Sequence, residues 1–569
     1  MLSLRSLLAV AISFALFHAA VAVSNLDSFD VREATVDGVH HALFTGITTC
    51  RAVVSGFLSR IEAFNPTINA IISLNPEALS LADGLDRYLA AGNATGRQLF
   101  CIPILLKDNY DAVPMNTTGG NLALAGNQPT ADAPAVQAFK DAGAIVLGKA
   151  NLHELALEGL SVSSLGGQTV NPYDQTRTPG GSSGGTGAAL AASFAVLGTG
   201  TDTVNSLRSP ASANGLVSVR PTWGLISRAG VIPVSYTQDV VGPMARNVKD
   251  LAVALTVMAS VGYDEGDNAT ALSRTSSLSG GTTATNDYTD YSASLYGGSL
   301  TGLRLGVFDG FFNHTDSAET TPVNNAMSYM MDFLRSAGVE IINITEPIYN
   351  ATALAKLDVQ TAEFREMLNT YLAGPSVQSD HSTGVPSSFD ELYTSSGGGF
   401  LVIPSQYDYI NTALVSSTSN ASHATNKVGI QNLALALHAS FARDDLDAII
   451  YPEQKNLVVK LGAPSQSGRN GILAALTGSP VVTVPIGFSP ASENGTAPIG
   501  VPIGMEILGQ PFTEGKLLNI AAHITREYPV RKMPPFANQS VETTSYAEVP
   551  TIIPNNDNIP PEYHVGCLS

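Results

Sequence analysis

The fold of this chain is decided by Gly180-Gly181-Ser182-Ser183-Gly184-Gly185, which leads into a run of small, largely apolar residues at 186–197. A polar loop at 198–210 follows and carries a second serine, Ser206. The pattern predicts a helix over 186–197 with a serine-bearing loop at each end. Glycines let two backbones approach closely and expose N–H groups, which suits a site that must hold an oxyanion. A flexible linker is the plain alternative, but a Gly/Ser linker is not normally followed by an Ala/Leu-rich helix.

Two shorter motifs in this region suggest other chemistry, and their context argues against both. Gly180-x-Ser182-x-Gly184 fits the nucleophile turn of Ser-His-Asp hydrolases, but that turn must follow a buried strand, and residues 169–179 are polar with two prolines. Gly143-x-x-x-x-Gly148-Lys149 resembles a phosphate-binding loop, yet Ala150 stands where a metal-binding Ser or Thr is required. We therefore expect neither a Ser-His-Asp triad nor nucleotide binding.

Helical and strand-like segments alternate along the chain, which predicts an α/β fold with a largely parallel sheet covered by helices. Helices are expected within 31–95 and over 133–142, 151–159 and 323–337, and strands over 101–106, 144–147, 303–307, 339–344, 481–484 and 501–508. The strand at 101–106 ends at Lys107-Asp108-Asn109, so these polar side chains are expected at the strand end, where ligands meet open α/β sheets. The Ser-, Thr- and Gly-rich segments 264–301 and 374–399 are expected to be loops that do not divide the chain into two domains.

Composition and charge indicate an acidic globular protein. Hydrophobic residues make up 44% of the chain and charged residues 14%, with a formal net charge of −19. Phosphate binding needs clustered Lys and Arg, so no nucleic-acid partner is expected. No Cys/His cluster has the spacing of a zinc site, and the neighbours His40 and His41 are expected on an amphipathic helix. We expect no metal and no cofactor.

The first 22 residues are typical of a cleaved signal peptide. Arg5 supplies the positive start, residues 7–17 an apolar core, and Ala20-Val21-Ala22 a small-residue cleavage site. The apolar run is shorter than the roughly 20 residues that span a bilayer, and no later stretch is long enough, so no membrane span is expected. The sequence therefore predicts secretion after cleavage near Ala22, with a main domain at 23–540 and an extended surface tail at 541–569.

The sequence also contains candidate glycosylation sites and three cysteines. Nine Asn-x-Ser/Thr sequons agree with a secretory pathway and are candidate glycosylation sites: Asn93, Asn116, Asn268, Asn313, Asn343, Asn350, Asn420, Asn494 and Asn538. The three cysteines, Cys50, Cys101 and Cys567, allow at most one intrachain disulfide, and three pairings are open. The oligomeric state is equally open.

The two serine loops belong to a longer set of motifs spread over about residues 30 to 530. These are Ile102-Pro103-Ile104-Leu105-Leu106-Lys107-Asp108-Asn109, Gly180 to Gly187, Gly200-Thr201-Asp202, Ser206-Leu207-Arg208, Pro210-Ala211, Asn214-Gly215, Arg220-Pro221-Thr222, Asp239, Gly242-Pro243, Gly478-Ser479-Pro480, Pro502-Ile503-Gly504 and Gly509-Gln510-Pro511-Phe512. Together they resemble the amidase signature family. The resemblance implies one α/β domain, with a mixed sheet covered by helices on both faces.

The resemblance also implies a Ser-Ser-Lys triad, with Ser206 as nucleophile, Ser182 as bridging serine and Lys107 as base, and a cis peptide bond before Ser182. A serine hydroxyl is a poor nucleophile at neutral pH unless a base removes its proton. Burial would lower the pKa of Lys107, so that its neutral amine could deprotonate Ser182, which in turn deprotonates Ser206. The implied reaction is hydrolysis of a small-molecule or peptide amide, with esters as a further class, through an acyl-enzyme.

The family's oxyanion hole corresponds here to the backbone N–H groups of Thr203, Val204, Asn205 and Ser206. Many members have Gly-Gly where this chain has Val204-Asn205, and a β-branched valine rarely adopts a left-handed conformation. We expect the N–H donors to be retained. A supporting polar network is expected from Asp202, Arg208, Lys149, Asn151 and Glu154, while Ser183 belongs to the loop of the bridging serine.

Two other functions compete with a secreted amidase. One is an amidotransferase component that acts on misacylated tRNA and shares the same core, but the signal peptide and the negative charge oppose it. A catalytically inactive binding protein on the same scaffold is the second, because of Val204-Asn205. The substrate cannot be read from the sequence, although specificity is expected in loops around Met115, 160–167 and 374–399.

Overall fold

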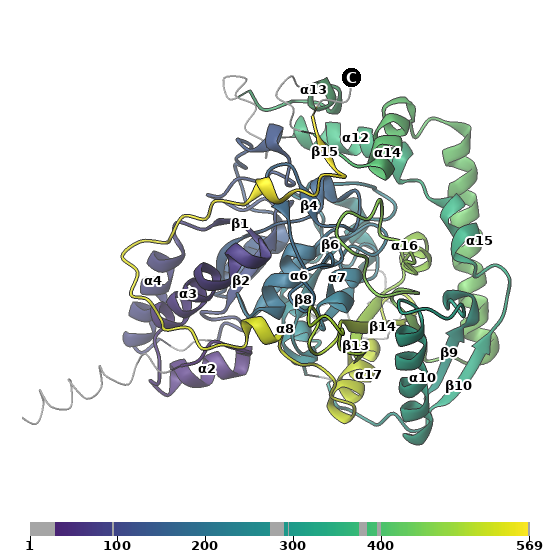
Figure 1. Ribbon diagram of the computed structural model, residues 1–569, viewed down its shortest axis with the longest axis horizontal. Helices are drawn as coiled ribbons and strands as arrows, with labels where there is room; N and C mark the ends of the chain where they lie inside the picture. Colours follow the sequence, from purple (N-terminus) through teal and green to yellow (C-terminus); the bar gives the residue numbers. More distant parts are fainter. Residues whose placement is uncertain are drawn as a thin grey trace, which may run out of the picture.

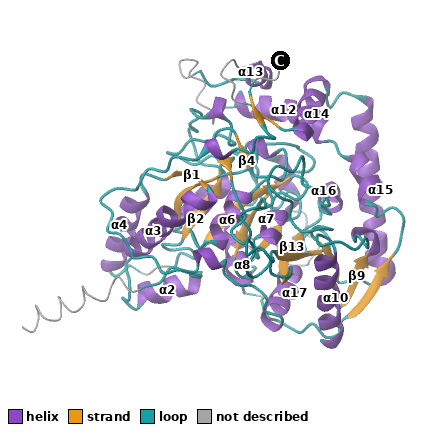
Figure 2. Ribbon diagram, in the orientation of Figure 1, coloured by secondary structure: helices purple, strands orange, loops and turns teal. Residues whose placement is uncertain are grey.

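The computed structural model describes residues 29–93, 96–273, 290–293, 295–374, 384–394 and 400–566. An 11-stranded mixed sheet forms its centre, with strand order β1-β3-β2-β6-β8-β7-β13-β14-β12-β9-β10 (Figures 1 and 2). Its strands are β1 (Ile71–Leu74), β2 (Pro103–Lys107), β3 (Ile145–Ala150), β6 (Leu197–Asp202), β7 (Val217–Arg220), β8 (Val240–Ala245), β9 (Arg304–Phe308), β10 (Glu340–Ile344), β12 (Ala448–Pro452), β13 (Val481–Phe488) and β14 (Pro502–Leu508). Two short antiparallel pairs lie outside it: β4 (Val162–Ser163) with β5 (Gly167–Gln168), and β11 (Leu401–Val402) with β15 (His564–Val565).

Helices pack against this sheet in groups. The helices are α2 (Val36–Phe44), α3 (Cys50–Ile68), α4 (Ala78–Ala90), α5 (Pro134–Asp141), α6 (Gly184–Ala191), α7 (Arg208–Ala213), α8 (Val248–Ala259), α10 (Thr321–Ser336), α11 (Ala351–Leu354), α12 (Gln360–Leu372), α13 (Phe389–Thr394), α14 (Pro404–Val415), α15 (Ala421–Asp444), α16 (Ile472–Thr477) and α17 (Glu514–Glu527). One group, α6 with α7, contacts β2, β6, β7, β13 and β14, while α8 with its neighbours α5 and α17 forms a second group. The α/β fold with a mixed sheet is thus confirmed.

The expectation of a largely parallel sheet was wrong. Parallel pairing is confined to the neighbours β3-β2-β6 and β12-β9-β10. The pairs in between are antiparallel, as is the pairing of β1 with β3. The reason lies in the connections, since β13 and β14 are joined by residues 489–501 without a crossover helix. A strand that returns directly beside its predecessor must run antiparallel to it.

The predicted helix over 186–197 was also too long. Helix α6 ends at Ala191, and residues 197–202, most of which were expected in a polar loop, form the fully buried strand β6. Its glycines are there for packing, since a Cβ at Gly200 would lie 2.4 Å from Leu207 Cδ1. Small residues at a close approach look like loop residues in a sequence.

Other predicted elements were confirmed or need correction. The strands expected at 101–106, 144–147, 303–307, 339–344, 481–484 and 501–508 correspond to β2, β3, β9, β10, β13 and β14. The helix expected over 151–159 is only a short 3-10 turn at Glu154–Ala156, where Leu155 and Ala156 have φ of 50° and 61°. Strand β1 interrupts the helices within 31–95. Of the loop expected at 374–399, residues 375–383 and 395–399 lie outside the described residues, and the part between them contains α13.

The two ends of the described chain lie against each other. Residues beyond Glu527 are mostly extended and run along the N-terminal helices, as the yellow trace in Figure 1 shows. Arg60 of α3 donates hydrogen bonds to the carbonyls of Ala537 and Gln539. The backbone N–H of Thr544 donates to Ser59 Oγ, and β15 pairs with β11.

A disulfide joins Cys50 to Cys101, with 5.7 Å between their Cα atoms. This settles the pairing that the sequence left open. Cys567 and the predicted signal peptide at 1–22 lie outside the described residues. The asparagines of all nine sequons are exposed or half exposed, so their glycosylation stays a prediction that the fold permits. Within the described ranges, no helix is both long enough and apolar enough to cross a bilayer.

Candidate active site

Lys107 ends β2, and its amine lies between two hydroxyl groups. Nζ donates hydrogen bonds to Ser182 Oγ at 2.7 Å and to Thr201 Oγ1 at 2.8 Å. Strand β6 pairs with β2 in parallel, which brings Thr201 alongside the end of β2. Complete burial lowers the pKa of Lys107 to about 7, although the carboxylates of Asp202 and Asp239 oppose this shift. A neutral amine is therefore available near neutral pH, in contact with the Ser182 hydroxyl.

The two serine loops are held together by their backbones. The N–H of Ser183 donates to the carbonyl of Ser206 at 3.1 Å, and the N–H of His153 donates to the carbonyl of Ser182 at 3.0 Å. The peptide bond between Gly181 and Ser182 is cis, as the family resemblance implied. A Cβ at Gly185 would lie 2.2 Å from the carbonyl oxygen of Asn151, so only glycine allows this close approach.

Ser206 is the accessible serine of the three. Ser182 and Ser183 are 0% exposed, whereas Ser206 is 7% exposed. Ser183 Oγ donates a long hydrogen bond of 3.4 Å to the carbonyl of Thr201. No residue in the described part of the chain forms a hydrogen bond with Ser206 Oγ. Of these three serines, Ser206 is thus the one with measurable exposed surface.

The loop expected to form the oxyanion hole keeps its N–H groups free. The N–H groups of Thr203, Val204, Asn205 and Ser206 donate to no acceptor within the described ranges. None of these four residues has a positive φ, so the valine at 204 is not forced into a left-handed conformation. The side chain of Val204 packs against an apolar cluster, and its carbonyl accepts a hydrogen bond from Arg208. The departure from Gly-Gly thus leaves the donors in place.

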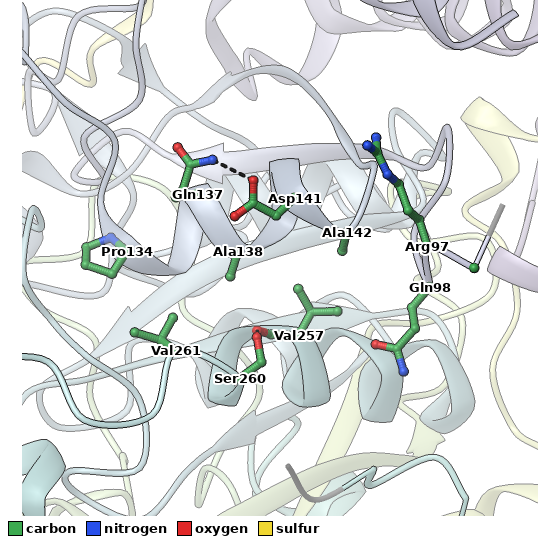
Figure 3. A pocket seen from close by; sticks show the side chains of 11 residues that line it. Arg97, Gln98, Pro134, Gln137, Ala138, Asp141, Ala142, Val257, Ser260 and Val261 are labelled. Atoms are coloured by element: carbon green, nitrogen blue, oxygen red, sulfur yellow. Dashed lines mark hydrogen bonds between the residues drawn. The ribbon is translucent and has the colours of Figure 1, made fainter. Parts of the chain in front are cut away.

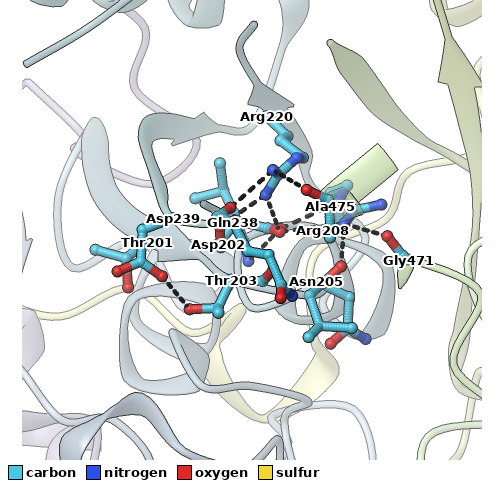
Figure 4. Close-up of polar contacts among 12 residues, drawn as sticks. Thr201, Asp202, Thr203, Asn205, Arg208, Arg220, Gln238, Asp239, Gly471 and Ala475 are labelled. Carbon is cyan, nitrogen blue, oxygen red and sulfur yellow. Dashed lines mark hydrogen bonds and ion pairs between the residues drawn. The ribbon is translucent and has the colours of Figure 1, made fainter. Parts of the chain in front are cut away.

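Behind this loop, two guanidinium groups converge on Asp202 (Figure 4). Arg208 donates to the two carboxylate oxygens of Asp202 at 3.0 and 3.1 Å, and Arg220 donates to it at 2.7 Å. The N–H of Leu207 also donates to Asp202, at 3.1 Å. Burial alone would raise the pKa of Asp202, but the two guanidinium groups hold it well below its usual range. Asp202 therefore stays ionised and fixes the turn that carries Ser206.

Three members of this network were missed from the sequence. Arg220 lies within a quoted motif but received no role, and Glu506 accepts from Arg208 at 2.7 Å. Glu453 accepts from Asn205 Nδ2 at 3.1 Å. Burial, reinforced by the neighbouring Glu506 carboxylate, raises the pKa of Glu453 above its usual range. A single carboxylate inside the apolar run 501–508 was the signal that could have revealed Glu506.

The other expected supporting residues lie around the neighbouring loops. Lys149 forms a buried ion pair with Asp108 at 2.8 Å. The carbonyl of Asn151 accepts from the N–H of Gly185 at 3.1 Å, which supports the loop that carries Ser182. Glu154 accepts from Asn121, from Ser164 and from the N–H of Leu401. These residues position loops and do not contact the Lys107 amine.

Replacing Arg208 with methionine is expected to destabilise the fold strongly. The substitution removes a guanidinium partner from two buried carboxylates, Asp202 and Glu506. Breaking a buried ion pair in this way costs roughly 3–5 kcal/mol of the free energy of unfolding, measurable by urea denaturation. The control is Arg335→Met, which breaks an exposed pair with Asp332 and is expected to cost less than about 1 kcal/mol. Equal losses in the two variants would contradict the structural role of Arg208.

A cavity of about 230 Å³ opens beside the loop that leads to Ser206. Thr201, Thr203 and Asp239 line one side of it, and Met367 and Tyr371 of α12 another. A larger hollow, of about 630 Å³, lies between α5 and α8, but it contains no predicted site residue (Figure 3). The larger of these two cavities is therefore not the one beside the predicted site residues. The segments expected to set specificity were those around Met115, 160–167 and 374–399, and none of their described residues lines the smaller cavity.

Known proteins resemble this chain along most of its length. The Amidase family profile matches residues 52–518. A component of the glutamyl-tRNA(Gln) amidotransferase of Methylobacillus flagellatus is 32% identical over 480 residues, which cover 83% of this chain and 92% of that protein. A probable amidase of Arabidopsis thaliana is 30% identical over 521 residues, which cover 90% and 93%. The structure of a peptide amidase from Stenotrophomonas maltophilia matches with a TM-score of 0.73 and 31% identity, covering 89% of this chain and 99% of that one. Because the family profile spans well over half of the sequence and agrees with the fold and the motifs, this chain belongs to the amidase signature family.

Proposed function

We propose that this protein is a serine amidase that hydrolyses carboxylic amides to an acid and an amine or ammonia. The observation that carries the proposal is the contact of 2.7 Å between Lys107 Nζ and Ser182 Oγ, in a fully buried setting beside the loop of Ser206. In the proposed reaction Lys107 takes the proton of Ser182, Ser182 takes that of Ser206, and Ser206 Oγ attacks the amide carbon.

Charge and protons balance through two half-reactions. The carbonyl oxygen becomes an oxyanion, and we assign the N–H groups of residues 203–206, which have no acceptor among the described residues, as its hydrogen-bond donors. The proton returns through Ser182 to the amide nitrogen as the C–N bond breaks, which leaves an acyl-enzyme on Ser206. Water then attacks the ester by the same route and releases the acid. Esters fit the same sequence of steps.

Activity is expected to rise with pH up to about 7 and then to level off. The reacting form of Lys107 is its neutral amine, and burial lowers the pKa of this group to about 7. Below that pH the neutral fraction falls tenfold per unit, and kcat/KM should fall with it. The measurement is a pH profile of kcat/KM, with tryptophan fluorescence recorded at each pH as a control for folding. A profile that is flat or falls between pH 5 and 7 would exclude Lys107 as the base.

An amidotransferase component is the second candidate, favoured by 32% identity to a protein of the glutamyl-tRNA(Gln) amidotransferase. The formal charge of −19 opposes it, because tRNA binding requires clustered positive charge. We propose instead a secreted enzyme, on the basis of the predicted signal peptide, the sequons and a disulfide of a kind that persists in oxidising compartments. Recovery of an active single chain from the culture medium, starting near residue 23, supports this proposal. An intracellular protein that needs partner proteins for activity would refute it.

A further inference from the structure

The cavity of about 230 Å³ adjoins the start of the loop that leads to Ser206. Thr203, the first residue of the loop that leads to Ser206, lines it, whereas Lys107, Ser182, Ser183 and Ser206 do not. The oxyanion is the oxygen of the acyl carbonyl, and the substituent of that carbonyl extends from the same carbon atom. The leaving amine must instead face Ser182, which returns the proton. The position of the cavity therefore matches the acyl part of a substrate.

The walls of the cavity are mainly apolar. Val231, Ile232 and Val234 line one part, and Met367 lines another. The hydroxyl of Tyr371 already donates to Asp111 at 2.7 Å, so this residue has no free donor for a ligand. An apolar cavity of about 150 Å³ is large enough to bind benzene, so the volume here suits an aromatic ring with a short linker or a branched aliphatic chain.

The charged groups at the cavity are already paired within the protein. Arg228 donates to both carboxylate oxygens of Asp267 at 2.7 Å, and its guanidinium lies over the rings of Trp223 and Tyr236. Asp239 accepts from Thr203 Oγ1 at 2.6 Å and from the N–H groups of Val234 and Ser235 at 2.7 and 2.8 Å. A charged substrate group would lose its hydration here without gaining a partner.

We propose that this cavity is the acyl-binding pocket and that it selects amides of neutral, apolar carboxylic acids, either arylalkyl or branched aliphatic. The inference rests on the proposed amidase function and names its substrate class. Met367 is the residue that tests it best, because it is half buried on α12 and flexible, and a larger side chain there reduces the cavity without disturbing the catalytic loops.

The test compares ammonia release from 3-phenylpropanamide, acetamide and succinamate. The kcat/KM for 3-phenylpropanamide is expected to exceed that for acetamide by about ten- to hundredfold, because its ring is buried in the pocket. Succinamate, which carries a carboxylate, is expected to be the poorest of the three. Met367→Trp should reduce the rate for 3-phenylpropanamide at least tenfold and leave that for acetamide within about twofold. The matched control is Met331→Trp, at a half-buried methionine on α10 outside the cavity.

Results that differ from these expectations separate an error in the pocket assignment from an error in the proposed amidase function. Equal kcat/KM values for the three amides, or an equal effect of Met367→Trp on all of them, would overturn the pocket assignment and leave the amidase function standing. N-benzylacetamide carries its ring on the amine side of the amide. If its kcat/KM exceeded that of acetamide and Met367→Trp removed the difference, the cavity would bind the amine part and the acyl assignment would be wrong. Failure to cleave any amide, together with no labelling of Ser206 by a fluorophosphonate, would instead refute the proposed function itself.

Discussion

Replacing Ser206 with alanine is expected to abolish amide turnover, lowering kcat roughly ten-thousandfold or more. Without the hydroxyl no acyl-enzyme can form, and the remaining groups act only by binding the substrate. The fold should be unaffected, because no described residue forms a hydrogen bond with Ser206 Oγ that the substitution would break. Ammonia release measures the first effect, and urea denaturation measures the second.

Labelling separates this prediction from a general loss of activity. A fluorophosphonate is expected to add one adduct to the wild-type chain, on the peptide that contains Ser206, and none to the Ser206→Ala variant. Ser336→Ala, which removes an exposed hydroxyl on α10, is the control that should keep both labelling and turnover. Near-wild-type turnover in the Ser206→Ala variant would end the assignment of the nucleophile.

Replacing Lys107 is expected to cost activity on a similar scale, because the site then has no base in contact with Ser182. Lys107→Ala should abolish amide turnover. Lys107→Met keeps the apolar stem and the volume, so it should preserve the fold while also losing turnover. Lys107→Arg should be equally inactive, since a guanidinium stays protonated and cannot accept the proton. Single-turnover rates with 3-phenylpropanamide at pH 8 measure these losses, and circular dichroism checks the fold.

Comparing turnover in the three Lys107 variants distinguishes a chemical role of the amine from a structural one. A merely structural lysine would be replaced adequately by arginine or methionine, and the pH dependence of kcat/KM below 7 would persist in both. Substantial turnover in a folded Lys107→Met protein would therefore contradict the role of the amine.

The candidate catalytic residues could be predicted because their signals are local. Ser182 stands in the loop before α6 and Ser206 in the loop after β6, and Lys107 ends an apolar strand at the point where the sequence turns polar. The family motifs then connected these three positions, which no spacing rule could do. The structure brings Lys107 and Ser182 into contact and joins the two loops through Ser183 and Ser206.

Features that depend on packing between distant segments could not be predicted. Strand β6 contains two glycines that read as loop residues, although they allow helix α6 and Leu207 to approach. The contact of Arg208 with Glu506 joins residues 298 positions apart. The cavity beside the site combines residues 228–241 with α12, and neither segment has a composition that marks it as a binding surface.

The meeting of the two chain ends has a consequence for synthesis. Arg531 pairs with Glu33, 498 positions away, and Arg60 reaches the carbonyl of Gln539 over 479 positions. At about 5–20 residues per second, a ribosome needs roughly 25–100 s to translate the chain between such partners. During that interval α3 emerges without the C-terminal segment that packs on it, and the guanidinium of Arg60 lacks half of its final acceptors. The earliest part of the protein to be made is therefore among the last to reach its native packing, and it is the part that a chaperone would have to shield.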